Sequence, residues 1–131
     1  MTTILLAIDT DVERAKEQVE SVTTLPLMRE DTRLIIYHVF RADGEGADAR
    51  NLRSVSTAIE KLEDAGFEVE VRQSSGDVVR GILDEAERID ADIISLAGRK
   101  RSPTKKALFG SVSQDVLLKS ERAVLFETTT N

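Results

Sequence analysis

Cysteine is absent from this sequence of 131 residues, and histidine occurs once. Disulfides, thiol nucleophiles and thiolate metal ligands are therefore excluded, and so is a histidine-rich zinc site. Long apolar runs are missing as well, because the first one, residues 4–8, is too short for the core of a signal peptide. We therefore expect a cytoplasmic protein without a membrane partner.

An excess of positive charge is also missing. The 24 Asp and Glu residues outnumber the 18 Lys and Arg residues, which gives a formal net charge of -6. General affinity for nucleic acids needs a broad basic face, so no nucleic-acid partner is expected. Hydrophobic residues make up 40% of the chain, as in ordinary globular proteins. This length and composition predict one domain, residues 1–131, with its own core.

Short apolar runs alternate with segments of helical periodicity along the chain. Strands are expected at residues 4–8, 34–40, 67–71, 92–97 and 123–126. Apolar residues recur at helical spacing between them, within residues 12–22, 52–65, 78–89 and 112–117. With right-handed crossovers this pattern predicts an α/β fold: a single doubly wound sheet of five parallel strands, in the order 3-2-1-4-5, with helices on both faces.

Local signals predict where several elements begin and end. Thr10 and Glu13 form a capping box at the start of the first helix. Residues 74–77 indicate a turn and an N-cap before the third helix. Apolar and charged side chains alternate over residues 67–71, which predicts a strand near an edge of the sheet. The apolar face of the last helix is expected to consist of Val112, Val116 and Leu117.

Residues 98–113 combine glycine with a concentration of positive charge. Gly98 ends an expected strand, and Gly110 and Ser111 lie near the start of an expected helix. Between the two glycines lie five cations, Arg99, Lys100, Arg101, Lys105 and Lys106. The free amides and dipole of a helix N-terminus, together with the backbone freedom of glycine, suit such a segment to a phosphate group. The alternative is a solvated basic loop that binds nothing.

An acidic turn after the first strand is expected to face this basic segment. In open α/β sheets, ligands bind beyond the carboxyl ends of the strands, where the strand order reverses. For the expected order the reversal falls between strands 1 and 4, so residues 9–11 and 98–113 border one crevice. A carboxylate there accepts hydrogen bonds from a ribose hydroxyl or a base amino group, while the basic segment holds phosphates. The main chain around Val39, at the end of strand 2, would face a base.

On these residues the sequence resembles the universal stress protein (UspA) family over essentially its whole length. The resemblance is carried by residues 4–9, His38 and Val39, Gly76, residues 91–94, Gly98 with residues 110–112, and residues 123–125. It implies an adenine nucleotide alpha hydrolase-like fold that usually dimerises, and a stress-response sensor or regulator whose ATP-binding members carry the motif Gly, two residues, Gly, nine residues, Gly, then Ser or Thr. Matched to that motif, the nucleotide contacts are Ala7, Asp9, Val39, Gly98, Lys100, Arg101, Gly110, Ser111, Val112 and Ser113.

Two departures from the motif leave the ligand open. Arg101 stands at the second motif glycine, and eight residues, not nine, separate it from Gly110. The arginine either binds phosphate through its side chain or fills the pocket and excludes ATP. In the second case the chain is a nucleotide-independent homodimeric interaction module of the same fold. Mg²⁺ would arrive with ATP, because it prefers phosphate together with one or two carboxylates.

No residue pattern indicates an enzyme. Ser111 has no base placed beside it, and the Gly-Lys-Ser ending of a phosphate loop is missing. His38 lies in an expected buried strand, so we interpret it as a hydrogen-bonded core residue rather than a general base. Asp9 and Asp11 could form a metal pair, but we interpret them as caps of the first helix. We expect at most slow, incidental ATP hydrolysis and no intrinsic metal.

The last expected strand, Ala123 to Phe126, bears on assembly. It is short, apolar and free of proline, so as a bare sheet edge it would favour aggregation. Pairing with a twofold-related copy would cover it, and the family resemblance implies the same homodimer. The alternative is a short edge guarded by Arg122 and Glu127.

Overall fold

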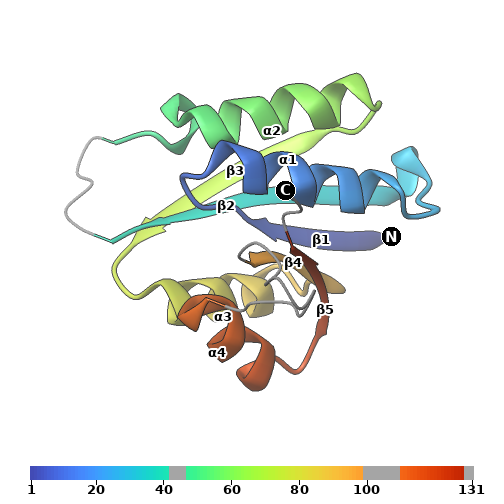
Figure 1. Ribbon diagram of the computed structural model, residues 1–131. Coiled ribbons are helices and arrows are strands. Elements are labelled where there is room, and N and C mark those ends of the chain that lie inside the picture. Colours follow the sequence, from blue (N-terminus) through green and yellow to red (C-terminus); the bar gives the residue numbers. More distant parts are fainter. Residues whose placement is uncertain (42–46, 99–109, 129–131) are drawn as a thin grey trace, which may run out of the picture.

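A single sheet of five parallel strands forms the centre of the protein (Figure 1). The structure is a computed structural model that describes residues 1–41, 47–98 and 110–128. The strand order is β3-β2-β1-β4-β5, which confirms the order expected from the sequence. The strands are β1 (Thr2–Ala7), β2 (Thr32–Phe40), β3 (Val69–Ser75), β4 (Ile93–Gly98) and β5 (Ala123–Thr128).

Helices cover both faces of the sheet, α1 and α2 on one and α3 and α4 on the other (Figure 1). The helices are α1 (Val12–Thr23), α2 (Arg53–Asp64), α3 (Val78–Arg88) and α4 (Ser111–Lys119), with short 3-10 turns η1 (Arg29–Asp31) and η2 (Ala49–Asn51). Ile4 and Leu6 pack under α1 and α2, whereas Leu5 packs under α3 and α4. Because neighbouring side chains of a strand point to opposite faces, a strand covered on both sides is apolar without alternation.

The third strand starts and ends later than predicted. It covers Val69–Ser75 rather than residues 67–71, so the two serines expected in a turn belong to the strand. Phe67 precedes the strand and is buried in the core, under the guanidinium of Arg29 at 5.2 Å. The reversal itself is made by Gly76, whose φ of +113° is unfavourable for other residues. The expected position of the strand at an edge of the sheet is confirmed.

Two further predictions at helix ends are wrong. The N-cap of α1 is Asp11, whose side chain accepts a hydrogen bond from the amide of Arg14; this confirms Asp11 as a cap, whereas the capping box of Thr10 and Glu13 is wrong. A carboxylate at this position also interacts favourably with the helix dipole, which a threonine hydroxyl does less well. In α4 Leu117 is 40% exposed, because only Val112 and Val116 turn toward the core.

Helix α3 packs closely against β2 at Gly81. A Cβ atom added at Gly81 would be 3.1 Å from Cγ2 of Val39 and 3.2 Å from the hydroxyl of Tyr37. Glycine at this position therefore lets the helix approach the end of β2, and the neighbouring Val78 and Ile82 form one wall of the site described below. Among the helices of the described residues, none is long and apolar enough to span a membrane.

Candidate functional site

The sheet opens between β1 and β4 at the carboxyl ends of these strands. Their pairing ends at Leu6 and Ser95, although both strands continue. The buried side chain of Gln18, on α1, donates hydrogen bonds to the main-chain oxygens of Ala7 (3.0 Å) and Ser95 (3.2 Å). Gln18 thus takes the place of a strand partner, and the strands separate without leaving these carbonyls unsatisfied.

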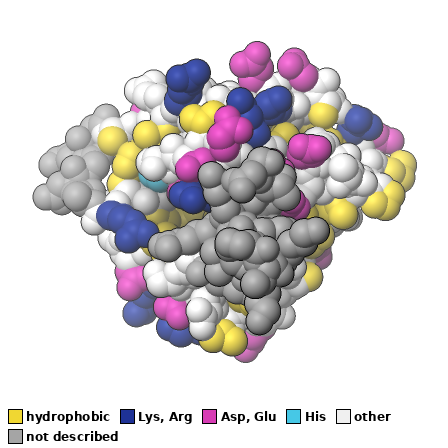
Figure 2. Space-filling model, viewed as in Figure 1, with side chains coloured by type: hydrophobic (Ala, Val, Ile, Leu, Met, Phe, Trp, Pro, Cys, Tyr) yellow, Lys and Arg dark blue, Asp and Glu magenta, His cyan; other side chains and the backbone are white. Residues whose placement is uncertain are grey.

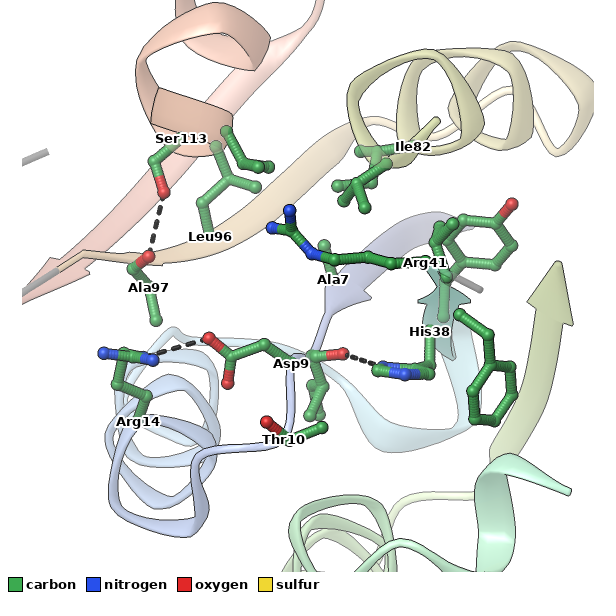
Figure 3. Close-up of a pocket in the computed structure, with 16 residues that line it drawn as sticks. Ala7, Asp9, Thr10, Arg14, His38, Arg41, Ile82, Leu96, Ala97 and Ser113 are labelled. Atoms are coloured by element: carbon green, nitrogen blue, oxygen red, sulfur yellow. Dashed lines mark hydrogen bonds and ion pairs between the residues drawn. The ribbon is translucent and has the colours of Figure 1, made fainter. Parts of the chain in front are cut away.

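A cavity of about 450 Å³ lies beyond this opening (Figure 3). Its volume is within the range of small-molecule sites, about 300–1,000 Å³. Apolar side chains from the ends of β1, β2 and β4 and from α3 form most of its walls, including Ala7, Val39, Val78, Ile82 and Leu96. Figure 2, in the orientation of Figure 1, shows the single histidine, in cyan, with hydrophobic side chains near it. Such a cavity has room for a flat apolar group with a polar rim.

Asp9 borders the cavity immediately after β1, and it is held from several sides. One carboxylate oxygen accepts the amide of Asp11 at 2.9 Å, and the other accepts Nε of Arg14 at 3.0 Å. The main-chain oxygen of Asp9 accepts the hydroxyl of Ser54, on α2, at 2.6 Å. The carboxylate is nevertheless 51% exposed, and each of its oxygens has a second lone pair. It can therefore accept hydroxyl donors from a ligand without losing these bonds.

Val39 presents main-chain groups on the opposite side of the cavity. The pairing of β1 with β2 ends at Ala7 and Tyr37, where the amide of Ile8 donates to the oxygen of Tyr37. Main-chain groups of alternate residues in a strand point the same way, so those of Val39 also point toward β1. The main-chain groups of Val39 lie beyond the last residue pair of β1 and β2. A ligand that carries one hydrogen-bond donor and one acceptor along the same edge can bond to them.

A smaller cavity of about 170 Å³ adjoins the first. Gly98, at the end of β4, and Gly110 and Ser111, at the start of α4, line it. Gly110 is the N-cap of α4, and a Cβ atom built there meets no atom of the described residues within 4 Å. Ser113 ties the helix to β4 by donating its hydroxyl to the oxygen of Ala97 at 2.9 Å. Free amides of the first helical turn and open space beside them suit a small anion.

Tyr37 and His38 form the floor of the larger cavity without offering a general base. Nδ1 of His38 lies 2.8 Å from the oxygen of Ile8, and the ring packs edge-on against Phe40, so the expected role as a hydrogen-bonded core residue is confirmed. Burial raises the pKa of the Tyr37 hydroxyl above its usual value, and the hydrogen bond with Ser74 opposes that shift in part. The tyrosine is therefore neutral at physiological pH.

The structure brings most of the site residues named from the sequence to these two cavities. Ala7, Asp9, Val39, Val112 and Ser113 line the larger one, and Gly98, Gly110 and Ser111 line the smaller one. Lys100 and Arg101 lie outside the described residues. The described residues contain no group of three or more His, Asp and Glu side chains placed to hold a metal ion.

Three residues of the site were missed from the sequence. Arg14 and Arg41 line both cavities, and Gln18 holds the two strands apart. Gln18 had a signal, since it is the polar residue on the apolar face that Ala15, Val19 and Val22 form. Arg14 follows Asp9 by five residues, and the turn before α1 together with the first turn of the helix brings the two side chains together. For Arg41 the only sequence signal is its place directly after a strand.

Fold and site together define an open, doubly wound α/β domain with a crevice where the strand order reverses. A family model described as the universal stress protein family matches residues 1–126. A universal stress protein of Mycolicibacterium smegmatis is 35% identical over 100 residues, which cover 74% of this chain and 76% of that protein. The chain therefore belongs to the universal stress protein family.

Solved structures agree with this assignment. The universal stress protein from Archaeoglobus fulgidus is 27% identical and superposes with a TM-score of 0.75, over 96% of this chain and 98% of that chain. A universal stress protein structure from the same organism, in complex with dAMP, is 22% identical with a TM-score of 0.74, over 96% of this chain and 97% of that chain. The fold is the adenine nucleotide alpha hydrolase-like fold of these proteins.

Proposed function

We propose that this protein is a cytoplasmic stress-response sensor or regulator that binds an adenine nucleotide, ATP in the first instance, in the crevice between β1 and β4. The observation that carries the proposal is the pair of adjoining cavities at the reversal of strand order, one apolar and one at the start of α4. The dAMP complex of the structural neighbour supports the choice of an adenine nucleotide.

Each part of a nucleotide has a complementary surface in this arrangement. The base fits between the apolar walls of the larger cavity, with its polar edge on the main chain of Val39. Ribose hydroxyls donate to the free lone pairs of Asp9. Phosphates lie at Gly110 and Ser111, where the amides of α4 and the helix dipole stabilise negative charge.

The proposed role is binding without turnover. Two side chains around the cavities that could act as a nucleophile or a base are already engaged in fixed contacts: the hydroxyl of Ser113 is bonded to Ala97, and the imidazole of His38 is bonded to Ile8. Hydrolysis needs a base within reach of an attacking water, and neither residue is placed for that task. Mg²⁺ would enter with ATP, held by phosphates with Asp9 as the available carboxylate.

A thermal-unfolding titration with ATP and Mg²⁺ tests the proposal. A ligand that binds only the folded state stabilises it by about 2.7 kcal/mol at a hundred times its Kd. For a domain of this size we expect the Tm to rise by roughly 5–10 °C. Absence of any rise with ATP, AMP or cAMP at millimolar concentration would contradict nucleotide binding and favour the nucleotide-independent interaction module.

A substitution at Gly110 locates the binding site. Gly110→Leu fills the smaller cavity but meets no described atom near its Cβ, so we expect the fold to be retained and the nucleotide-dependent rise in Tm to disappear. Gln114→Leu, at an exposed position of the same helix, is the matched control and keeps the rise. Equal loss in both variants would mean that the helix, and not the cavity, had been damaged.

We also propose that two copies pair through β5 to form a homodimer. In the sheet that the described residues form, β5 is an edge strand that pairs with β4, and its side chains from Val124 to Glu127 are half-buried. Arg122 does not guard this edge, because its guanidinium is bonded to Asp90 and to the oxygen of Ala91. A twofold copy covers such an edge with main-chain hydrogen bonds.

A further inference from the structure

Three charged side chains line the two cavities among the described residues: Asp9, Arg14 and Arg41. The first turn of α4, which closes the smaller cavity, contains no acidic residue. The charges of the lining therefore sum to one positive charge, on top of the positive end of the helix dipole. This local excess stands out in a chain whose formal net charge is -6.

The two arginines differ in how they are held. Arg14 forms an ion pair with Asp9, with 3.0 Å between Nε and the carboxylate, and its Nη2 lies 3.8 Å from the carboxylate of Asp11. Arg41 forms no hydrogen bond or ion pair with any of the residues that the structure describes. Among the charges that the described residues bring to the site, the one without a partner is therefore that of Arg41.

The position of Arg41 connects the two cavities. It follows the last residue of β2, and in Figure 3 its side chain extends inward over the cavity, with the guanidinium toward the side that Leu96 and Ala97 form. Arg41 lines the apolar cavity together with Ile82, and it lines the small cavity together with Gly98 and Gly110. A guanidinium in this place faces the junction between the space for a nucleoside and the space for its phosphate.

We propose that Arg41 is a phosphate-binding residue that makes this site select nucleotides over nucleosides. The inference rests on the proposed function and deepens it. Arg41 approaches the phosphate from the β2 side, opposite the amides of α4, and binds it through charge-assisted hydrogen bonds. The apolar walls of the cavity lower the local dielectric and strengthen this interaction relative to one in water.

Calorimetric titration with AMP and with adenosine tests the assignment on the full chain. We expect Arg41→Ala to weaken AMP binding roughly ten- to a hundredfold and to leave adenosine binding within about twofold of wild type. Arg41→Lys keeps the charge without the planar fork and gives an intermediate loss of AMP affinity. Arg80→Ala, which removes the same charge from an exposed position of α3 that does not line either cavity, is the matched control and leaves both affinities unchanged.

The possible results separate this inference from the proposed function. Wild-type binding of AMP that Arg41→Ala leaves unchanged, or a loss that is equal for AMP and adenosine, overturns the role of Arg41 while nucleotide binding stands. Wild-type failure to bind either ligand overturns both. Thermal unfolding without ligand should be the same for wild type and Arg41→Ala, because the side chain is exposed, and a lower Tm would point to a structural role.

Discussion

At the scale of single residues, the site depends on polar groups that replace missing main-chain partners. Gln18 is 1% exposed, and its amide bonds to Ala7 and Ser95 where the sheet opens. His38 similarly bonds to the oxygen of Ile8, and Ser54 bonds to the oxygen of Asp9. These side chains fix the carboxyl end of β1 in an open arrangement, before any ligand arrives.

Replacing Gln18 by leucine tests this role. Gln18→Leu roughly keeps the volume and increases hydrophobicity, yet it leaves the buried oxygen of Ser95 and the partly buried oxygen of Ala7 without this donor. We expect the free energy of unfolding, measured in urea, to fall by about 1–3 kcal/mol, and the nucleotide-dependent rise in Tm to shrink. Glu20→Leu, at an exposed position of the same helix, should change stability by less than about 0.5 kcal/mol. A Gln18→Leu protein as stable as wild type would contradict the role.

Some of these residues could be assigned to the site from the sequence and others could not, for physical reasons. Asp9 could be predicted, because a carboxylate that closes an apolar strand must lie at the end of the sheet. The position of Gln18 on an apolar helix face was a signal, but its partners could not be predicted, because one polar residue there has no unique partner until the strands opposite are placed. The assignment of the α1 cap to Thr10 was wrong because Asp11, one residue later, competes for the same amides.

At the scale of elements, a row of ion pairs joins β2, β3 and α3 on the side of the sheet away from α2. Arg33 forms two hydrogen bonds with Glu70, at 3.0 and 3.2 Å. Arg72 lies 3.8 Å from Glu70 and 3.3 Å from Glu85, whose buried carboxylate is also bonded to Arg88 at 2.7 Å. Paired charges thus replace apolar packing at the edge of the sheet, where β3 has one wet face.

The ion pair of Glu70 predicts a pH-dependent contribution to stability. The hydrogen bond from Arg33 lowers the pKa of the Glu70 carboxyl below its ordinary value of 4.5, and partial desolvation opposes this. A pKa lowered by folding means stability that is present above pH 4.5 and is lost as the pH falls through the folded-state value. Since the pair is largely exposed and screened by solvent, Glu70→Gln should cost at most about 1 kcal/mol at pH 7.

Urea unfolding of Glu70→Gln and wild type at pH 7 and pH 3.5 measures this contribution. The difference between the two proteins should be clearly smaller at the lower pH. Glu68→Gln removes an exposed carboxylate that forms no ion pair among the residues described by the structure, and it should show little difference at either pH. A Glu70→Gln effect of equal size at both pH values would mean that charge is not its cause.

Element order could be predicted from the sequence more reliably than element ends. Apolar runs and helical spacing identify each strand and helix because burial on one or two faces dictates them. The ends of β3 were misplaced because Phe67 continues the apolar alternation while it packs outside the sheet, and because Ser74 and Ser75 pair with Val39 and Phe40 of β2. Both effects depend on tertiary contacts.

At the scale of the whole molecule, the position of β5 at the edge of the sheet predicts association. Ala123→Lys places a charge on the exposed first residue of this strand. A twofold copy would bring a like charge close by, so we expect a monomer. Ala123→Thr adds a side chain without charge and should remain a dimer. Sedimentation velocity distinguishes the two, with circular dichroism to show that both are folded. A wild-type protein that sediments as a monomer at micromolar concentration would contradict the homodimer.

The larger cavity takes its walls from both strand ends at the centre of the sheet and from segments as far apart in sequence as Ala7 and Ser113. No short fragment of the chain can therefore reconstitute it. A ligand bound there would raise the free energy of unfolding of the whole domain. Amides of the central strands that exchange only when the whole domain unfolds would therefore exchange more slowly. Ligand binding in this cavity would therefore be coupled to unfolding of the whole domain and not of one segment.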